Sequence, residues 1–452
     1  MNPAFYGSLS KLPPMKTILA LSFCVGWLAG SASAAPLEGL WEKDPLWEFS
    51  PQTFEEKARE LGFRWTSQQK DSARSAGAGL TLGGIPLVEV IARFSQDKIS
   101  SLTLQLYTRG DAGSLSRPDY ESLIKKSTDL VNSLSKAKLQ MLGKDPANPV
   151  RAEGVVWKGA RTKWLLEYSM SRETTPQGVK MNPEFVRLEL SPVLQKKEQS
   201  KELAQNAKAK PKDRVKKLPN GDVRIEGIPM VDQGQKGYCF PASAERVLRS
   251  YGMKTDQNEL AQLAGNKGGG TSLSGGIEGL KLAGLRLQFR VRMVDETAMR
   301  EFEVLVREYN WRVLKYGQKE QVQPFVGAVD LDEVLMGLRP DVLRAARMAM
   351  RAEKGRFFRS MQGAVDAGHP LIWGVLLGLI KEPGIPQGAG GHARLILGYN
   401  AKTNECLYSD SWGAGHELKR MSLDDAWMIH QFSFMLLPNG VDSPTLSQDK
   451  AH

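Results

Sequence analysis

The most informative part of the sequence is PMVDQGQKGYCFPASAERVLRSYG, residues 229–252. Its first half is polar and contains glycine, whereas its second half carries apolar residues at the spacing of one helix face. Pro241 suits the first turn of a helix, and Gly252 suits the residue that ends it. The pattern predicts a loop followed by a helix, with Cys239 at the helix N-terminus.

Cys239 has a chemical reason to be reactive at that position. A cysteine attacks a carbonyl carbon as the thiolate, and the partial positive charge of a helix N-terminus favours that form. Gln233 lies six residues earlier in the loop. Its side-chain amide would donate to a developing oxyanion beside the Cys239 backbone N–H. A small cysteine buried at the start of a core helix is the alternative interpretation.

His392 is the best placed of the five histidines to act as a base. It follows the sequence GAGG at 388–391 and opens the apolar run 393–399, which predicts a position at a strand end. The other four histidines lie in polar stretches, at the chain end or before a proline. A structural histidine with satisfied hydrogen bonds is the alternative for His392.

The tetrapeptide DSWG at 410–413 follows His392 by eighteen residues, after another short strand. Asp410 would accept the second imidazole N–H and orient the ring, while Trp412 would shield that bond from water. The spacing therefore predicts a triad of Cys239, His392 and Asp410.

These motifs resemble, in order and spacing, those of papain-like cysteine peptidases. That family carries a Gln-Gly pair six residues before the nucleophile, a His opening a strand some 130–150 residues later, and Asn-Ser-Trp-Gly beyond. Here Gln233-Gly234, Cys239 and His392 match, with a Cys-to-His gap of 153 residues. The segments GYCFPASAERVLRSYG and HARLILGY look most like those of the bacterial branch that includes the double-glycine-leader (bacteriocin-processing) peptidases.

The resemblance covers residues 221–440 and implies an α+β fold with a helical half and an antiparallel β half. It implies a thiol hydrolase that cleaves peptide or protein substrates through a thioester, with no metal or organic cofactor. It also suggests that the loop glycines Gly269 and Gly270 lie beside an extended substrate, together with Trp412. A plain flexible loop is the alternative for the glycines.

Three features depart from the family pattern. Lys236 replaces the cysteine that papain carries before the nucleophile, so the disulfide of that cysteine is absent. Asp410 replaces the usual Asn, as it does in the bacterial branch. The mostly helical stretch 295–367 is enlarged and is expected to cover or reshape the substrate cleft.

Residues 36–194 predict a separate small α+β domain. Thr53 and Glu56 match a capping box that opens a short helix. Alternating residues on both sides of Gln96-Asp97 predict a β-hairpin, residues 118–142 have helical spacing, and three strands follow between 155 and 190. This part shows no catalytic cluster. It is expected to be an inhibitory pro-segment, a partner-binding module or a membrane-proximal spacer.

Residues 195–220, QKKEQSKELAQNAKAKPKDRVKKLPN, carry nine basic and three acidic side chains and almost no large apolar ones. This segment, at net +6, and residues 344–359, at net +5, account for the whole formal charge of +11. Such local excess argues against a nucleic-acid-binding surface. We expect an exposed basic linker between two domains, with binding to an anionic surface or polymer as the alternative.

Residues 1–34 predict an export signal. Lys16 precedes an apolar run, 17–30, that is too short to span a bilayer, and Ala32-Ser33-Ala34 suits a signal peptidase. A membrane anchor is the alternative. Cleavage after Ala34 would leave a periplasmic or extracellular chain with no transmembrane anchor.

The sequence predicts an exported cysteine peptidase, and two rival functions remain open. A transglutaminase-like protein or a cell-wall amidase would use the same triad for acyl transfer. A catalytically silent protein would use the basic segments to hold an anionic partner.

Overall fold

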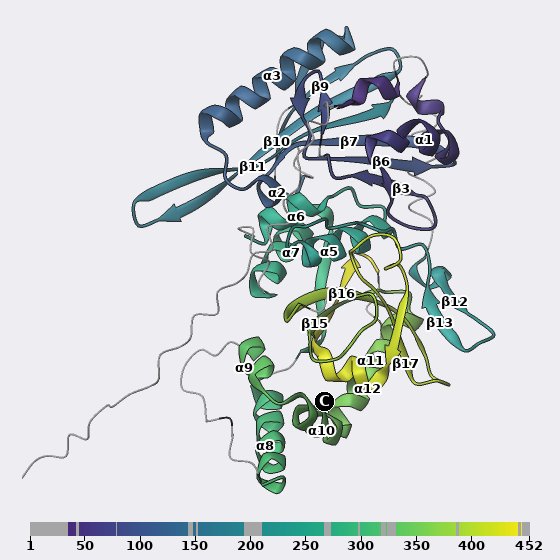
Figure 1. Ribbon diagram of the computed structural model, residues 1–452, viewed down its shortest axis with the longest axis vertical. Coiled ribbons are helices and arrows are strands. Elements are labelled where there is room, and N and C mark those ends of the chain that lie inside the picture. Colours follow the sequence, from purple (N-terminus) through teal and green to yellow (C-terminus); the bar gives the residue numbers. More distant parts are fainter. Residues whose placement is uncertain are drawn as a thin grey trace, which may run out of the picture.

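The computed structural model describes residues 35–41, 45–77, 79–142, 148–150, 152–193, 210–265, 273–296, 299–317, 322, 331–385, 388–441 and 444. These residues form an α+β structure with two eight-stranded antiparallel sheets, one on each side of the segment 194–209. We call residues 35–193 the N-terminal unit and residues 210–441 the C-terminal unit. Figure 1 shows α5, α6 and α7 between the N-terminal sheet and strands β15 and β16 of the C-terminal sheet.

The N-terminal sheet has the strand order β2-β3-β6-β7-β11-β10-β9-β8. The strands are β2 (Arg64–Trp65), β3 (Ser72–Ser75), β6 (Glu89–Ser95), β7 (Lys98–Thr108), β8 (Leu139–Leu142), β9 (Glu153–Lys158), β10 (Thr162–Thr175) and β11 (Gly178–Pro192). The other elements are the small sheet β1 (Ala35–Pro36), β4 (Leu80–Leu82) and β5 (Ile85–Pro86), the helices α1 (Pro51–Ala58), α2 (Arg109–Ala112) and α3 (Arg117–Ser135), and the 3₁₀ helices Leu37–Leu40, Leu46–Glu48 and Arg59–Leu61.

The hairpin predicted in this unit forms between β6 and β7. Its connection, Gln96-Asp97, has φ values of 52° and 57°, the left-handed pair that matches the twist of two-residue hairpins. The helix predicted over 118–142 is shorter, because Lys136 adopts φ 48° after Ser135 and residues 139–142 pair with β9 instead. The side chains of the sheet and of α3 share one apolar core.

The start of α1 differs from the capping box expected at Thr53. Ser50 is the N-cap, and its Oγ accepts the Thr53 backbone N–H at 3.2 Å. Pro51 explains the shift, because its fixed φ and missing N–H suit the first helical position.

The C-terminal sheet has the order β12-β13-β16-β15-β19-β14, with β17 and β18 added beside β16. The strands are β12 (Val215–Lys217), β13 (Asp222–Ile225), β14 (Phe289–Glu296), β15 (Leu371–Leu377), β16 (Gly390–Asn400), β17 (Glu405–Ser409), β18 (Lys419–Ser422) and β19 (His430–Pro438). The helices are α5 (Cys239–Ser250), α6 (Gln257–Leu263), α7 (Leu273–Leu287), α8 (Met299–Lys315), α9 (Leu331–Gly337), α10 (Pro340–Ala349), α11 (Arg351–Asp366) and α12 (Leu423–Ile429), with a 3₁₀ helix at Pro211–Arg214.

Both faces of this sheet are buried. Val247 of α5 packs with Leu395 of β16 in one apolar cluster, whereas Phe357 of α11 packs with Ile396 in another. Adjacent strand residues point to opposite faces, so one strand serves both clusters. The result is three layers, with α5–α7 on one face and α11 and α12 on the other.

Two sequence expectations need adjustment in the C-terminal unit. The last residues of the expected linker are ordered, because 211–214 form a 3₁₀ helix and Val215–Lys217 pair with β13. The expected helical stretch 295–367 begins in β14 and then holds α8, α9, α10 and α11. Residues 194–209 lie outside the described residues.

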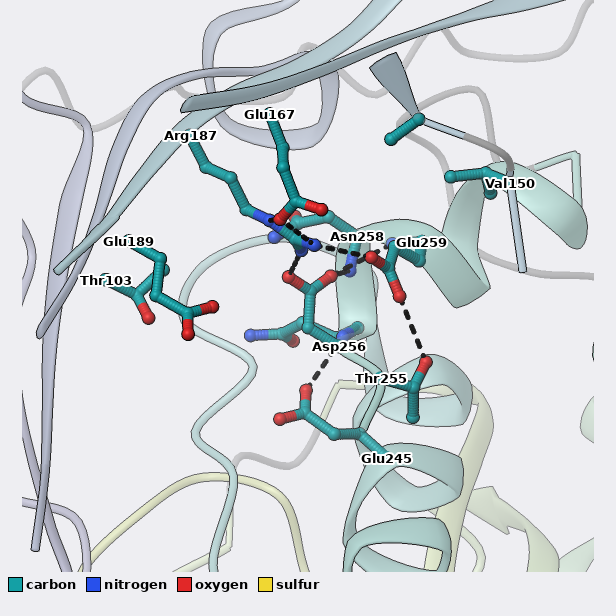
Figure 2. Close-up of polar contacts among 12 residues, drawn as sticks. Thr103, Val150, Glu167, Arg187, Glu189, Glu245, Thr255, Asp256, Asn258 and Glu259 are labelled. Atoms are coloured by element: carbon teal, nitrogen blue, oxygen red, sulfur yellow. Dashed lines mark hydrogen bonds and ion pairs between the residues drawn. The ribbon is translucent and has the colours of Figure 1, made fainter. Parts of the chain in front are cut away.

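Buried charges join the two units. Arg187 of β11 reaches Glu167 of its own sheet at 2.8 Å, Glu259 of α6 at 2.5 Å, and also Asp256 at the N-cap of α6. Figure 2 shows this cluster, in which one guanidinium meets three carboxylates. Because buried charges are costly unless paired, the cluster ties the N-terminal sheet to α6.

The described helices include none with both the length and the apolar character needed to cross a bilayer. The predicted export signal, residues 1–34, lies outside the described residues.

Candidate active site

Cys239 is the first residue of α5 and is partly buried. Burial raises the pKa of its thiol. A hydrogen bond from His392, the charge of that ring and the backbone N–H groups of Ala393 and Phe240 all lower the pKa, and together they outweigh burial. The net pKa of Cys239 lies below its ordinary value. The position expected from sequence, a helix N-terminus beside a histidine, is thus formed.

His392 and Asp410 are joined by a hydrogen bond. Nε2 of His392 lies 2.9 Å from Oδ1 of Asp410, and both side chains are buried. Burial lowers the pKa of His392, but its bonds to Asp410 and Cys239 outweigh burial and raise the pKa to about 9. Burial raises the pKa of Asp410, yet its hydrogen bond to His392, the nearby ring of His416 and the charge of Arg394 together hold the pKa below the ordinary range.

Trp412 covers the imidazole of His392. The two rings are stacked, with centroids 4.4 Å apart and planes 12° apart. His416 packs edge-on against Trp412 at 5.5 Å, and its Nδ1 lies 4.0 Å from Oδ2 of Asp410. The apolar face of Trp412 thus reduces the access of water to the bond between His392 and Asp410.

Arg394 is the second donor to Asp410. It lies two residues after His392 on β16, so both side chains leave the same face of the strand. Nε of Arg394 donates to Oδ1 of Asp410 at 2.8 Å, and its two terminal nitrogens donate to Glu382 at 2.9 and 3.1 Å. Tyr408 donates to Glu382 at 2.7 Å. Asp410 is therefore oriented by a fully buried guanidinium as well as by His392.

Arg246 links α5 to the Asp410 segment. It lies seven residues after Cys239 on the same helix, and its guanidinium donates to the Asp410 backbone oxygen at 2.8 Å and to Ser409 Oγ at 2.7 Å. A third bond reaches the Pro229 carbonyl at 2.9 Å. The helix that carries the thiol and the strand end that carries the carboxylate are thus fixed to each other.

Gln233 is buried beside the DSWG segment. Its Oε1 accepts from Ser411 Oγ at 2.6 Å, and its backbone N–H donates to the Ser411 carbonyl at 2.8 Å. Its Nε2 donates to the Lys236 carbonyl at 3.0 Å, which orients the side-chain amide. One N–H of that amide remains for a further acceptor.

The other histidines and cysteine considered from the sequence do not share the surroundings of Cys239 and His392. His369 bonds to Tyr251, and burial lowers its pKa to about 4. His430 accepts from the Trp373 indole in the core. Cys406 is fully buried on β17, and burial raises its pKa to about 12. Gly269 and Gly270, proposed from sequence to lie beside substrate, are outside the described residues.

Arg394 and Arg246 were not predicted from the sequence. Arg394 is a charged residue inside the apolar run 393–399, two positions from His392, and that period-2 relation was a usable signal. Arg246 lies away from the apolar face formed by Ala244, Val247 and Leu248, and its partners are far away in the sequence, so sequence spacing does not indicate them.

No group of three or more His, Cys, Asp or Glu side chains within the described ranges is arranged to hold a metal ion. Comparison with models of known protein families and with curated protein sequences finds no match to this chain. The geometry around Cys239, His392 and Asp410 therefore carries the functional interpretation.

Proposed function

We propose that this chain is an exported cysteine peptidase with a papain-like domain, in which Cys239 is the nucleophile. The observation that carries the proposal is geometric: Cys239 is the first residue of α5, and Asp410 orients His392 through a hydrogen bond of 2.9 Å. The pKa directions agree with this geometry. The pKa of the Cys239 thiol is lowered while that of His392 is raised to about 9. These directions favour a thiolate beside an imidazolium near neutral pH.

The arrangement supports a two-step acyl transfer. The Cys239 thiolate attacks the scissile carbonyl carbon, and the carbonyl π electrons move to its oxygen. The free N–H of Gln233 and the Cys239 backbone N–H would donate to that oxyanion. When the C–N bond breaks, His392 gives its Nδ1 proton to the leaving amine, and a thioester remains.

Hydrolysis of the thioester reverses these roles. His392, now neutral, takes a proton from water, whose oxygen attacks the thioester carbon. The C–S bond then breaks and the thiolate returns beside the imidazolium. Asp410 keeps the ring in the orientation that both steps need.

Alkylation with iodoacetamide tests the nucleophile. We expect Cys239 to react well below the ordinary thiol pKa of about 8.5, while the buried Cys406 stays unlabelled in the folded protein. Labelling of both cysteines only above neutral pH would contradict the ion pair.

Turnover of a peptide library tests the reaction. The Cys239→Ala variant should fold and lose hydrolysis, because the change removes one sulfur from a partly buried site. Retained hydrolysis would reject the proposal. Transfer of the acyl group to an added primary amine instead of water would identify an acyltransferase.

A further inference from the structure

The loop that carries Gln233 is held from outside the C-terminal unit. We call residues 232–238 the Gln233 loop. Lys236 of this loop is buried, and its Nζ lies 2.7 Å from Oδ2 of Asp111 and 3.5 Å from Oε2 of Glu89. Both carboxylates belong to the N-terminal unit, Asp111 to α2 and Glu89 to β6.

The other end of the loop has a similar anchor. Nη1 of Arg74, a residue of β3, lies 3.6 Å from Oδ2 of Asp232. Nε of the same guanidinium donates to Oε1 of Glu89. Glu89 thus uses one oxygen for Arg74 and the other for Lys236. Its side chain is 1% exposed. A single buried carboxylate therefore connects the anchors on both sides of Gln233.

Close backbone packing supports the same contact. Gly234 has φ +68°, and a Cβ there would lie 2.5 Å from Nη2 of Arg74. A Cβ on Gly110 would lie 2.5 Å from the hydroxyl oxygen of Tyr238. A side chain at either position would displace Arg74 or Tyr238, so the two units are in close contact at both ends of the loop.

These contacts bear directly on the Gln233 amide. The Lys236 carbonyl accepts both Gln233 Nε2 at 3.0 Å and the Tyr238 backbone N–H at 2.7 Å. Burial lowers the pKa of Lys236, but Glu89 and Asp111 outweigh it and hold the pKa above the ordinary value, so the Lys236 ammonium stays charged. Where the carbonyl lies depends on where the charged side chain is held.

We propose that the N-terminal unit is a permanent part of the catalytic machinery, in which Glu89 positions Gln233 through Lys236 and Arg74. This inference rests on the proposed function. A loop that lost its buried anion would shift, and a displacement of about 1 Å at a catalytic group costs roughly a hundredfold in rate. The unit would then activate the site, and an inhibitory pro-segment would be the wrong description of it.

The experiment compares Glu89→Gln with Glu189→Gln in the full chain. Both changes replace a carboxylate of the N-terminal sheet that pairs with a lysine of the C-terminal unit, since Glu189 meets Lys254 at 3.3 Å. The second pair does not involve the Gln233 loop. Peptide hydrolysis, iodoacetamide alkylation of Cys239 and hydrogen–deuterium exchange of peptides covering 231–238 are measured for each.

We expect Glu89→Gln to lower kcat by about tenfold to a hundredfold with little change in KM, because Gln233 acts on the transition state. Exchange of the loop amides should rise by roughly tenfold, as one anchored hydrogen bond weakens. The pH profile of Cys239 alkylation should stay as in the parent, because His392 and Asp410 are untouched. Glu189→Gln should match the parent in all three.

Unchanged kcat and unchanged loop exchange in Glu89→Gln would overturn the inference. If the parent hydrolyses no peptide, the proposed function fails, while the exchange of the loop still tests the anchor separately. Should Glu89→Gln not fold, Asp111→Asn replaces it, because Asp111 is 19% exposed and contacts the same Lys236. Asp111→Asn should raise loop exchange and lower kcat, each by a smaller factor than Glu89→Gln. Values equal to those of the parent would overturn the inference.

Discussion

Arg394 donates through Nε to Oδ1 of Asp410 at 2.8 Å, the same oxygen that accepts from His392. A fully buried guanidinium needs anionic partners, and Glu382 supplies the other one. This relationship gives a physical reason for the aspartate in the DSWG motif, which resembles the Asn-Ser-Trp-Gly motif of papain-like peptidases. The carboxylate both orients His392 and compensates Arg394.

Replacing Asp410 separates orientation from charge. Asp410→Asn keeps an oxygen that can accept from His392, so we expect most of kcat to remain, whereas Asp410→Ala loses much more. The carboxylate contributes to the raised His392 pKa of about 9. The alkaline limb of the pH–rate profile should therefore move to lower pH in Asp410→Asn. Equal damage by Asn and Ala would indicate a neutral thiol and imidazole at rest.

Arg394→Lys tests the guanidinium that holds Asp410. A lysine keeps the charge but cannot reach Asp410 and Glu382 together with a planar fork. We expect kcat to fall by about tenfold and the free energy of unfolding by about 2 kcal/mol. Arg420→Lys is the matched control, because Arg420 also meets two carboxylates, each at 3.0 Å, but is 46% exposed. Arg420→Lys should leave kcat unchanged and lower the free energy of unfolding by no more than about 1 kcal/mol. Equal effects of the two variants would remove the special role of Arg394.

Gln233→Ala removes the proposed oxyanion donor. The expected loss in kcat is on the order of 10²–10³, with little change in KM. Steady-state kinetics on one peptide substrate measures both. A change confined to KM would assign Gln233 to packing with Ser411 instead of catalysis.

Cleavage within residues 195–209, the part of the predicted basic linker 195–220 that lies outside the described residues, tests how the two units stay together. A polar lysine-rich segment between folded units is a preferred site for proteases. Because Arg187, Glu89 and Lys236 join the units through buried ion pairs, we expect the two fragments to remain associated and active. Size-exclusion chromatography with activity of the pooled peak measures this. A rise in activity on cleavage would instead favour an inhibitory N-terminal unit.

Glu259 predicts a pH dependence of stability. Burial is the main reason that its pKa rises to about 7, against the opposing charge of Arg187, while Asp256 and Glu167 raise it further. Because the folded pKa exceeds the unfolded one, the unfolded chain releases this proton first as pH rises. Stability should therefore fall between about pH 4.5 and 7 and then level off.

Glu259→Gln should remove that dependence. The amide resembles the protonated acid, so the variant should match the parent in Tm near pH 5 and exceed it near pH 8. Thermal unfolding of both proteins at the two pH values measures the difference. A parent that gains stability relative to the variant above pH 7 would show that Glu259 is charged and favourably paired at neutral pH.

Local sequence patterns predicted the elements whose geometry is set by residues close together in the chain. The hairpin at Gln96-Asp97 formed where expected because turn geometry is set by two residues. The helix that starts at Cys239 also formed where expected, because its apolar spacing and the glycine that ends it, Gly252, lie within the same segment. Errors arose at boundaries, as at Ser50 and Ser135, where an adjacent proline or a strand partner decided the end.

The order of residues 239, 392 and 410 in the chain was enough to suggest that these three side chains lie together. The residues that orient them, Arg394 and Arg246, were not found, because each acts on a partner brought near only by packing. Glu89 and Lys236 lie 147 residues apart in the sequence and belong to different units, so no local pattern encodes their contact. Residue type and spacing in the sequence were thus enough to suggest the members of the candidate site. Tertiary structure decided which buried charges hold that site in place, because a charge becomes costly, and therefore paired, only once folding has removed it from water.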